Sequence, residues 1–242
     1  MIILSFDIGI KNLAYCKLKF NNKTDMNHDI LDWNIINCAE DIISKNLKCS
    51  VIRKGNICGK DAVEKIIDNN LEKGFCKLKT CQKYLYKNCD IKKKKIIKIK
   101  KISVNKIPLS ELGNILYFYL DKIMINDIDL ILVENQPALK NPTMKSIQMM
   151  LFSFFVFKKN YSNANYQIEF FNASKKLKIY DGPKVDTEHL KNKYNKRKYL
   201  AIKYTSYLLK KNNTEYITFF ENNQKKDDLA DSYLQGITFY YK

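Results

Sequence analysis

The apolar segments of this 242-residue chain follow an order that few folds accommodate. Three segments of strand length come first, separated by short polar links typical of antiparallel hairpins: IILSFD at 2–7, LAYCKLKF at 13–20 and ILDWNII at 30–36. From Pro108 the pattern alternates, with helices expected at 108–124, 140–159, 195–211 and from about 227, and strands at 127–134 and 166–173. The order predicts an α/β fold, a mixed five-stranded sheet with helices on both faces.

Residues 38–107 break this order. They contain clustered cysteines, scattered glycines and the lysine-rich run KKKKIIKIKK at 92–101. A chain of this length fits one main domain with an insertion better than two full domains. We therefore expect a main domain formed by 1–37 and 108–242, and a small cysteine-rich insertion at 38–107.

Acidic residues stand at the ends of apolar segments. Asp7 ends the first strand just before Gly9, and Glu134 ends the strand at 127–134, which Asn135-Gln136-Pro137 stops. Both carboxylates are therefore expected at the carboxyl edge of the sheet, where open α/β sheets place ligands. Asp228 and Asp231, three residues apart at a helix start, share one helix face. Taken singly, Asp7 is also explained as a turn residue, and the helical pair as a favourable helix N-terminus.

Together these carboxylates indicate a metal site, because converging negative charges require a compensating cation. Oxygen ligands without a nearby histidine favour Mg²⁺ or Mn²⁺ over zinc. Two such ions about 4 Å apart catalyse in-line phosphodiester hydrolysis. The neighbouring Asp227 competes with Asp228 as a ligand; helical spacing favours Asp228, and Asp227 is expected to be the helix N-cap.

Four motifs occur in a specific order: SFDIGIKNLA, ILVENQP before an apolar helix, KRKYLAIK and KKDDLADSY. In residues 1–37 and 108–242 the chain resembles the poxvirus Holliday junction resolvases, members of the RuvC-like branch of the RNase H fold. The resemblance implies an RNase H-like nuclease domain, a divalent-metal requirement, a homodimer, and resolution of four-way DNA junctions by paired symmetric nicks in viral DNA recombination and concatemer resolution.

The resemblance also assigns residues. It implies that the metal-binding, catalytic carboxylates are Asp7, Glu134, Asp228 and Asp231. The family uses a lysine near the scissile phosphate as well. Lys198 in KRKYLAIK is the best match, with Lys176 in NASKKLK as the rival. A cation there stabilises charge that develops on the phosphate oxygens.

The insertion departs from the compact poxvirus enzymes, although resolvases of other large DNA viruses resemble this chain in having a cysteine-rich insert. Four cysteines follow the spacing C-x8-C-x17-C-x4-C with glycines beside two of them: Cys49, Cys58, Cys76 and Cys81. Four thiolates satisfy a tetrahedral structural Zn²⁺; free intracellular thiols are the alternative. Cys89 is a substitute ligand.

The remaining cysteines and the histidines have simpler interpretations. Cys16 and Cys38 lie on or beside predicted strands and are expected to be small core residues. His28 and His189 lie in polar stretches and are expected to be solvated rather than ligating.

The formal net charge of +18 favours a polyanionic partner. However, 41 of the 43 basic residues are lysine, which is also the signature of an A/T-rich genome. The run at 92–101 is interpreted either as a lysine-rich edge strand or as an arm that binds phosphate. No secretion signal or membrane span is recognisable. We expect an intracellular protein, in the host cytoplasm at sites of viral DNA replication.

The helix expected at 140–159 is too apolar for a wet surface, so we expect it to be a core helix that also forms a homodimer seam, since paired nicks need two active sites related by symmetry. Three rivals to the junction resolvase stay open: an RNase H-like nuclease acting on RNA–DNA hybrids or flaps, an actin-like kinase, and a non-catalytic DNA-binding module. An actin-like kinase needs a second phosphate-binding Asp-Gly loop, but no Asp-x-Gly recurs in this sequence, which contains only seven glycines.

Overall fold

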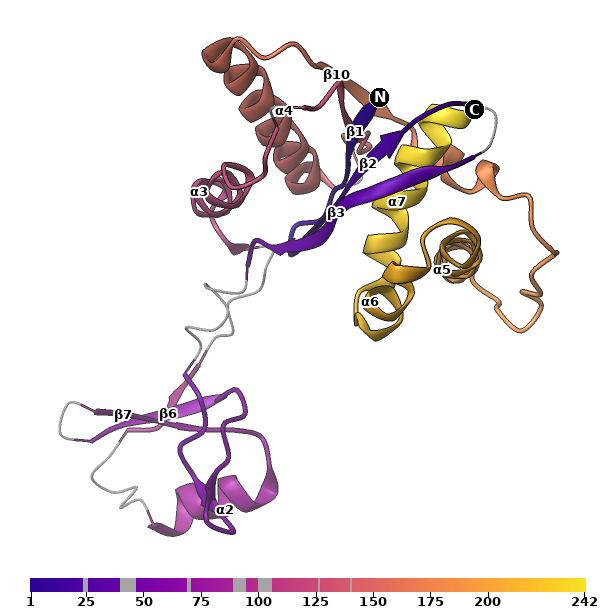
Figure 1. The fold of residues 1–242 in the computed structure, drawn as a ribbon. Helices are drawn as coiled ribbons and strands as arrows, with labels where there is room; N and C mark the ends of the chain where they lie inside the picture. Colours follow the sequence, from indigo (N-terminus) through magenta and orange to yellow (C-terminus); the bar gives the residue numbers. More distant parts are fainter. Residues whose placement is uncertain are drawn as a thin grey trace. The chain divides into compact units, whose positions relative to one another are not determined.

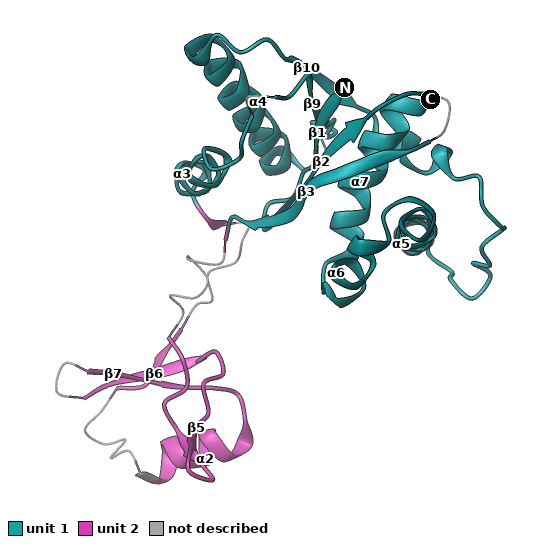
Figure 2. Cartoon of the chain, viewed as in Figure 1, with its two compact units in different colours: residues 1–38, 108–242 teal, residues 39–107 magenta. Residues whose placement is uncertain are grey.

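The computed structural model describes residues 1–23, 26–39, 47–68, 71–88, 95–99, 106–125, 127–139 and 141–242. The chain divides into two compact units (Figure 2), which we call unit 1, Met1–Cys38 with Pro108–Lys242, and unit 2, Ala39–Ile107. Among the described residues, no helix is both long enough and apolar enough to cross a membrane.

Unit 1 is built on a five-stranded sheet. Its order is β10-β9-β1-β2-β3, from β1 (Ile2–Asp7), β2 (Asn12–Phe20), β3 (His28–Asn37), β9 (Leu130–Glu134) and β10 (Gln167–Phe171). Strands β1, β2 and β3 form antiparallel hairpins, whereas β1, β9 and β10 are parallel. Parallel pairing requires crossover connections, which the helices provide. The predicted mixed five-stranded sheet is confirmed.

Helices cover both faces of this sheet, which explains why β1 is apolar on both sides (Figure 1). Ile3 belongs to the core beneath α7 (Lys226–Tyr241), whereas the ring of Phe6 packs 5.5 Å from that of Phe155 on α4 (Pro142–Ser162). Helix α3 (Leu109–Leu120) lies beside α4. On the other face α5 (Lys193–Asn212) and α6 (Ile217–Asn222) contact α7. Two short 3₁₀ helices, η2 (Ala173–Ile179) and η3 (Thr214–Tyr216), precede α5 and α6.

Local sequence explains where α4 begins. The Asn141 side chain accepts a hydrogen bond from the backbone N–H of Met144 at 3.2 Å, and Pro142 occupies the first helical turn, where its missing N–H costs nothing. Ile147, Leu151 and Phe155 are buried. The same helix exposes Phe157 and Tyr161, which are 66% and 80% accessible. Helix α4 is therefore buried on one side and leaves aromatic rings on the other.

The described residues of unit 2 form two small sheets and one helix. A hairpin joins β4 (Ile52–Arg53) to β5 (Asn56–Ile57), and a second sheet has the order β7-β6-β8, from β6 (Glu64–Asp68), β7 (Leu71–Phe75) and β8 (Ile97–Lys98). Helix α2 (Lys79–Asn88) follows β7. Strand β8 is the described part of the lysine-rich run and pairs Lys98 with Glu64 at the edge of the sheet. The other described residues of the run, 95, 96 and 99, belong to no strand, and 92–94, 100 and 101 lie outside the described residues.

The structure corrects one expectation for the isolated residues. His28 is buried rather than solvated: its ring lies within hydrogen-bonding distance of the Tyr233 hydroxyl, at 2.8 Å. Burial lowers the pKa of His28 to about 4. His189 is exposed, as expected, and Cys16 and Cys38 are buried core residues. Cys89, the substitute ligand, lies outside the described residues.

Candidate active site

Parallel pairing of β1 with β9 brings the first two predicted carboxylates together. Phe6 pairs with Val133, so Asp7 and Glu134 are the next residues along both strands. Because side chains alternate along a strand, both carboxylates project on the side of the sheet that α7 covers. The backbone N–H of Ile8 lies 3.4 Å from Glu134 Oε2.

The turn after Asp7 depends on Gly9. A Cβ atom at this position would lie 2.1 Å from the backbone oxygen of Asn12, a distance that no side chain tolerates. Glycine is therefore required where the chain folds back from β1 to β2, directly beside the carboxylate.

Helix α7 brings the other two carboxylates to the same edge. Its buried residue Gln235 donates hydrogen bonds to the carbonyl oxygens of Phe6 at 3.1 Å and Leu132 at 3.3 Å, which ties the helix to the ends of β1 and β9. Asp231 lies one turn before Gln235 and Asp228 one turn earlier, so both face the strand ends. Asn12 Nδ2 lies 3.4 Å from Asp228 Oδ2.

A buried lysine occupies the centre of the carboxylates. Lys176, only 3% exposed, lies on η2 directly after β10, with its Nζ 2.7 Å from Asp7 Oδ1, 3.3 Å from Glu134 Oε1 and 3.4 Å from Asp231 Oδ2. The short η2 helix, capped by the Asn172 side chain, turns Lys176 inward. The resemblance favoured Lys198 in KRKYLAIK and left Lys176 as the rival. A short 3₁₀ turn has no periodic sequence pattern that could have reversed this order.

The charges in this cluster do not balance. Burial raises the pKa of Asp7 well above its ordinary value, with Lys176 opposing and the other carboxylates reinforcing the change. Burial also raises the pKa of Asp231. For Lys176, burial favours deprotonation, but the three carboxylates outweigh it and raise its pKa. One ammonium thus faces three carboxylates, and the cluster retains excess negative charge when all are ionised.

Asp227 and Lys198 form a separate ion pair at the start of α7. The expected N-cap role of Asp227 is wrong, because Lys225 is the cap and Asp227 lies in the first turn. Lys198 also lies 4.9 Å from the centroid of the Tyr194 ring. Asp228, unlike Asp227, lines the cavity that contains the carboxylates.

That cavity has a volume of about 420 Å³. Its lining combines acidic and basic side chains: Asp7, Glu134, Asp231, Lys176, Arg197 and Lys198. Lys176 is buried, whereas Arg197 is exposed and Lys198 half-buried. A buried acidic floor below an exposed cationic rim suits cations inside the cavity and a phosphate group at its mouth.

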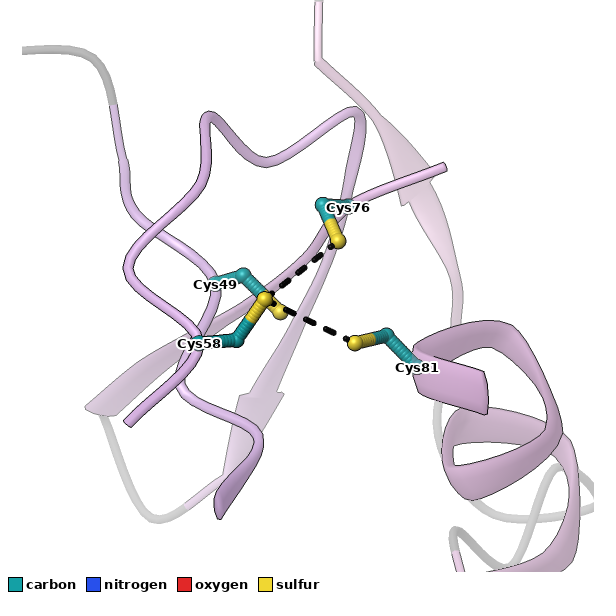
Figure 3. Close-up of side chains that lie close together, drawn as sticks. All are labelled: Cys49, Cys58, Cys76 and Cys81. Atoms are coloured by element: carbon teal, nitrogen blue, oxygen red, sulfur yellow. Dashed lines mark hydrogen bonds between the residues drawn. The ribbon is translucent and has the colours of Figure 1, made fainter. Parts of the chain in front are cut away.

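A second cluster lies in unit 2. The sulfur atoms of Cys49, Cys58, Cys76 and Cys81 all lie within 4.8 Å of one another (Figure 3). Within the described part of the chain, these four thiols lie close enough together to bind one shared ion. The carboxylates of unit 1 are instead arranged around the Lys176 ammonium. The thiol cluster is compatible with a structural zinc ion.

Comparisons with known proteins match this picture. A family model described as "Mitochondrial resolvase Ydc2 / RNA splicing MRS1" matches residues 3–137. The "Uncharacterized protein L451" of Acanthamoeba polyphaga mimivirus is 30% identical over 307 residues, covering 98% of this chain and 74% of the relative.

Solved structures extend the comparison. The yeast mitochondrial Holliday junction resolvase Ydc2 is similar with a TM-score of 0.50 and 16% identity, covering 99% of this chain and 78% of the yeast chain. The fowlpox virus resolvase, solved with its substrate Holliday junction DNA, has a TM-score of 0.47 and 16% identity, covering 99% of this chain and 97% of that one. The likeness to the yeast protein shows a shared fold.

Proposed function

The chain belongs to the family described as mitochondrial resolvase Ydc2 / RNA splicing MRS1, and from this premise we propose that it is a metal-dependent endonuclease that resolves four-way DNA junctions by paired symmetric nicks. The family description joins a resolvase with an RNA-splicing protein, so membership alone does not choose between cleaving and binding. The convergence of Asp7, Glu134 and Asp231 inside one cavity carries the choice. A module that only binds nucleic acid gains nothing from buried carboxylates, because they repel phosphate and cost desolvation energy.

The carboxylates suit divalent cations. They offer hard oxygen ligands, and their excess negative charge over Lys176 supports binding of Mg²⁺ or Mn²⁺. Asp7, Glu134, Asp228 and Asp231 would hold two ions, which would supply Lewis acidity to the attacking and leaving oxygens of an in-line displacement.

The basic side chains have separate tasks in this proposal. With cations bound at the carboxylates, the Lys176 ammonium would no longer be their main counter-charge, and it would stabilise the negative charge that develops on the scissile phosphate. Lys198 and Arg197, at the rim of the cavity, hold the phosphates that flank it. The position of Lys176 among the carboxylates favours it over Lys198 as the catalytic lysine.

We further propose that the active enzyme is a homodimer joined through α4. Two symmetric nicks need two active sites related by a two-fold axis, which a self-complementary interface provides. The exposed apolar side chains Met149, Val156, Phe157 and Tyr161 on this helix suit such an interface, with a second copy of the chain as the occupant. Phe157→Lys should shift the protein from dimer to monomer in sedimentation, whereas a Phe157→Lys protein that remains dimeric would place the interface elsewhere. The proposed location is the host cytoplasm, at sites of viral DNA replication.

The decisive experiment compares three substrates. Purified protein with Mg²⁺ is offered a four-way junction, a flapped duplex and an RNA–DNA hybrid, and we expect paired nicks in the junction above all. Preference for the hybrid or the flap would instead support the RNase H-like alternative.

A variant tests the carboxylates. Asp7→Asn should keep junction affinity and lose cleavage by about 10³-fold or more. The control is Asp29→Asn, which changes an exposed aspartate on β3 and should cleave normally. Full cleavage by Asp7→Asn would eliminate the carboxylate site, and a wild type that binds junctions without cutting them would support the non-catalytic alternative.

A further inference from the structure

We propose that unit 2 holds a structural zinc ion through the four thiolates of Cys49, Cys58, Cys76 and Cys81. The Sγ atom of Cys58 lies 3.8 Å from that of Cys76 and 3.8 Å from that of Cys81 (Figure 3). A tetrahedron with metal–sulfur bonds of about 2.3 Å has sulfur–sulfur edges of about 3.8 Å, whereas a disulfide bond measures about 2.05 Å. The thiols are thus spaced as ligands of one ion.

The four ligands come from three places that the fold fixes independently. Cys49 and Cys58 flank the β4–β5 hairpin, where the N–H of Cys58 donates to Val51 at 2.8 Å and that of Gly59 to Cys49 at 3.1 Å. Gly59 has a φ of 63°, which glycine adopts without strain. Cys76 directly follows β7 and Cys81 lies in the first turns of α2. One ion would therefore join the hairpin, the second sheet and the helix.

The core of unit 2 needs this ion. In its described residues, the buried cluster consists of Val51, Ile66, Phe75 and Leu85 plus three of the cysteines. A domain of this size rarely gains enough stability from its apolar core alone and commonly relies on a metal or disulfides. When the ion binds, the four thiols release their protons to solvent and the complex carries two negative charges, which the surrounding lysine-rich surface offsets.

Metal analysis tests the proposal directly. Protein purified without chelators should contain about one zinc per chain, and replacing it with Co²⁺ should give the visible absorption of tetrahedral cobalt and a sulfur-to-cobalt charge-transfer band. Cys58→Ser and Cys81→Ser should lower zinc to less than a tenth of the wild-type content. Cys16→Ala, which removes a buried thiol of unit 1, should retain it.

Several results would overturn the zinc site. One is wild-type protein that contains no zinc and whose thiols all react with a thiol reagent. Another is protein that contains iron in place of zinc. A third is a cobalt-substituted protein whose spectrum lacks the charge-transfer band. The cobalt measurement uses wild-type protein, so it remains decisive if the serine variants fail to fold.

A second observation, the distribution of charge, points to a further role for unit 2. Residues 39–107 contain 19 lysines and arginines against 7 acidic residues, so this unit carries +12 of the net charge of +18. Helix α2 contains no acidic residue, and Lys79, Lys83 and Lys87 recur at every fourth position. With Gln82 and Tyr86 they line a shallow hollow on one helix face. We call these five residues the α2 basic face.

We infer that the α2 basic face binds the phosphate backbone of a duplex arm of the substrate, a contact that rests on the proposed junction-resolving function. Lysines four residues apart are spaced about 6 Å along the helix, so each can reach its own phosphate. Tyr86, 53% exposed, adds a hydroxyl that also suits phosphate and sugar, whereas the Gln82 amide already donates to the Cys76 carbonyl at 2.8 Å. Because the contact reads no base, it serves a nuclease that recognises branched structure.

Salt dependence measures this contact. The triple variant Lys79→Gln, Lys83→Gln and Lys87→Gln should bind a four-way junction with a weaker salt dependence. The magnitude of the negative slope of log affinity against log salt should fall by about 2–3. The matched control replaces Lys23, Lys210 and Lys242, which are exposed lysines of unit 1 near the ends of β2, α5 and α7 remote from the cavity.

Two outcomes would overturn the α2 basic face. One is an equal change of slope in both triple variants, and the other is an unchanged junction slope together with lost binding to anionic lipid vesicles. Binding is measured without Mg²⁺ and without a chelator, so that unit 2 keeps its zinc. A wild type that binds but never cleaves after Mg²⁺ is added would refute the proposed function without affecting this contact.

Discussion

The two clusters of potential ligands are built in opposite ways. In unit 1, Asp7 and Glu134 extend from strand ends above a large hydrophobic core, and Lys176 supplies a cation from the chain itself. In unit 2, thiols make up much of the buried cluster, and no side-chain cation occupies their centre in the described residues. A domain that folds without its metal can use the metal for catalysis. A domain whose buried core consists largely of metal ligands uses the metal for stability.

The largest expected effect is metal withdrawal. A strong chelator should unfold unit 2 and leave unit 1 folded, because structural zinc sites contribute about 10–16 kcal/mol to folding. Limited trypsin digestion of the whole chain should then cut within 39–107 and spare 1–38 and 108–242. Chelated protein that resists trypsin throughout would show that the core of unit 2 is sufficient by itself.

The second largest effect is expected from removing Lys176, the cation among the carboxylates of unit 1. Lys176→Met removes the cation shared by Asp7, Glu134 and Asp231, so the free energy of unfolding without Mg²⁺ should fall by about 3–5 kcal/mol, as when one partner of a buried ion pair is deleted. Mg²⁺ should restore much of this loss in urea titrations. Lys198→Met is the matched control; it breaks only a half-exposed pair and should cost less than about 1 kcal/mol. Equal losses in both variants would contradict the central role of Lys176.

Acid should weaken unit 1 through a group outside both clusters. Burial lowers the pKa of His28 to about 4, below its unfolded value of 6.5, so folding favours the neutral ring. Its contribution is fully present above pH 6.5 and is lost as the pH falls from 6.5 to 4, to a limit of about 3 kcal/mol. Unfolding measured across this range should show a steeper decline for wild type than for His28→Gln; parallel curves would show that His28 is not titrating as described.

The smallest expected effect concerns the packing of α7 against the sheet. Gly236→Ala would place a Cβ 2.5 Å from the Cδ1 of buried Leu18, and should cost about 1–3 kcal/mol while disturbing the carboxylates on the same helix. Gly113→Ala in α3 is the control, because its Cβ would lie 3.4 Å from the flexible Met150 side chain. That change should be neutral or stabilise by up to about 1 kcal/mol. Thermal denaturation distinguishes the pair, and equal shifts would show that α7 has room to move.

Much of the fold could be predicted because its signals are local. The alternation of apolar segments identified every strand of the five-stranded sheet, and the helix expected at 140–159 corresponds to α4 (Pro142–Ser162). His28 was misjudged because polar neighbours in sequence say nothing about Tyr233, 205 residues away, whose hydroxyl contacts the buried ring. The N-cap of α7 was misplaced for a related reason, since Asp227 pairs with Lys198 instead of capping the helix.

The candidate sites divide in the same manner. The sequence by itself identified the candidate carboxylates and thiols, because a carboxylate at the end of a buried strand and four cysteines within residues 49–81 are visible without coordinates. Only the tertiary structure decided that Lys176 rather than Lys198 lies among the carboxylates, and that the four thiols share one centre. The physical reason is that these arrangements arise where segments distant in sequence meet, and the pairing of β1 with β9 and the packing of η2 and α7 against them fix those meetings.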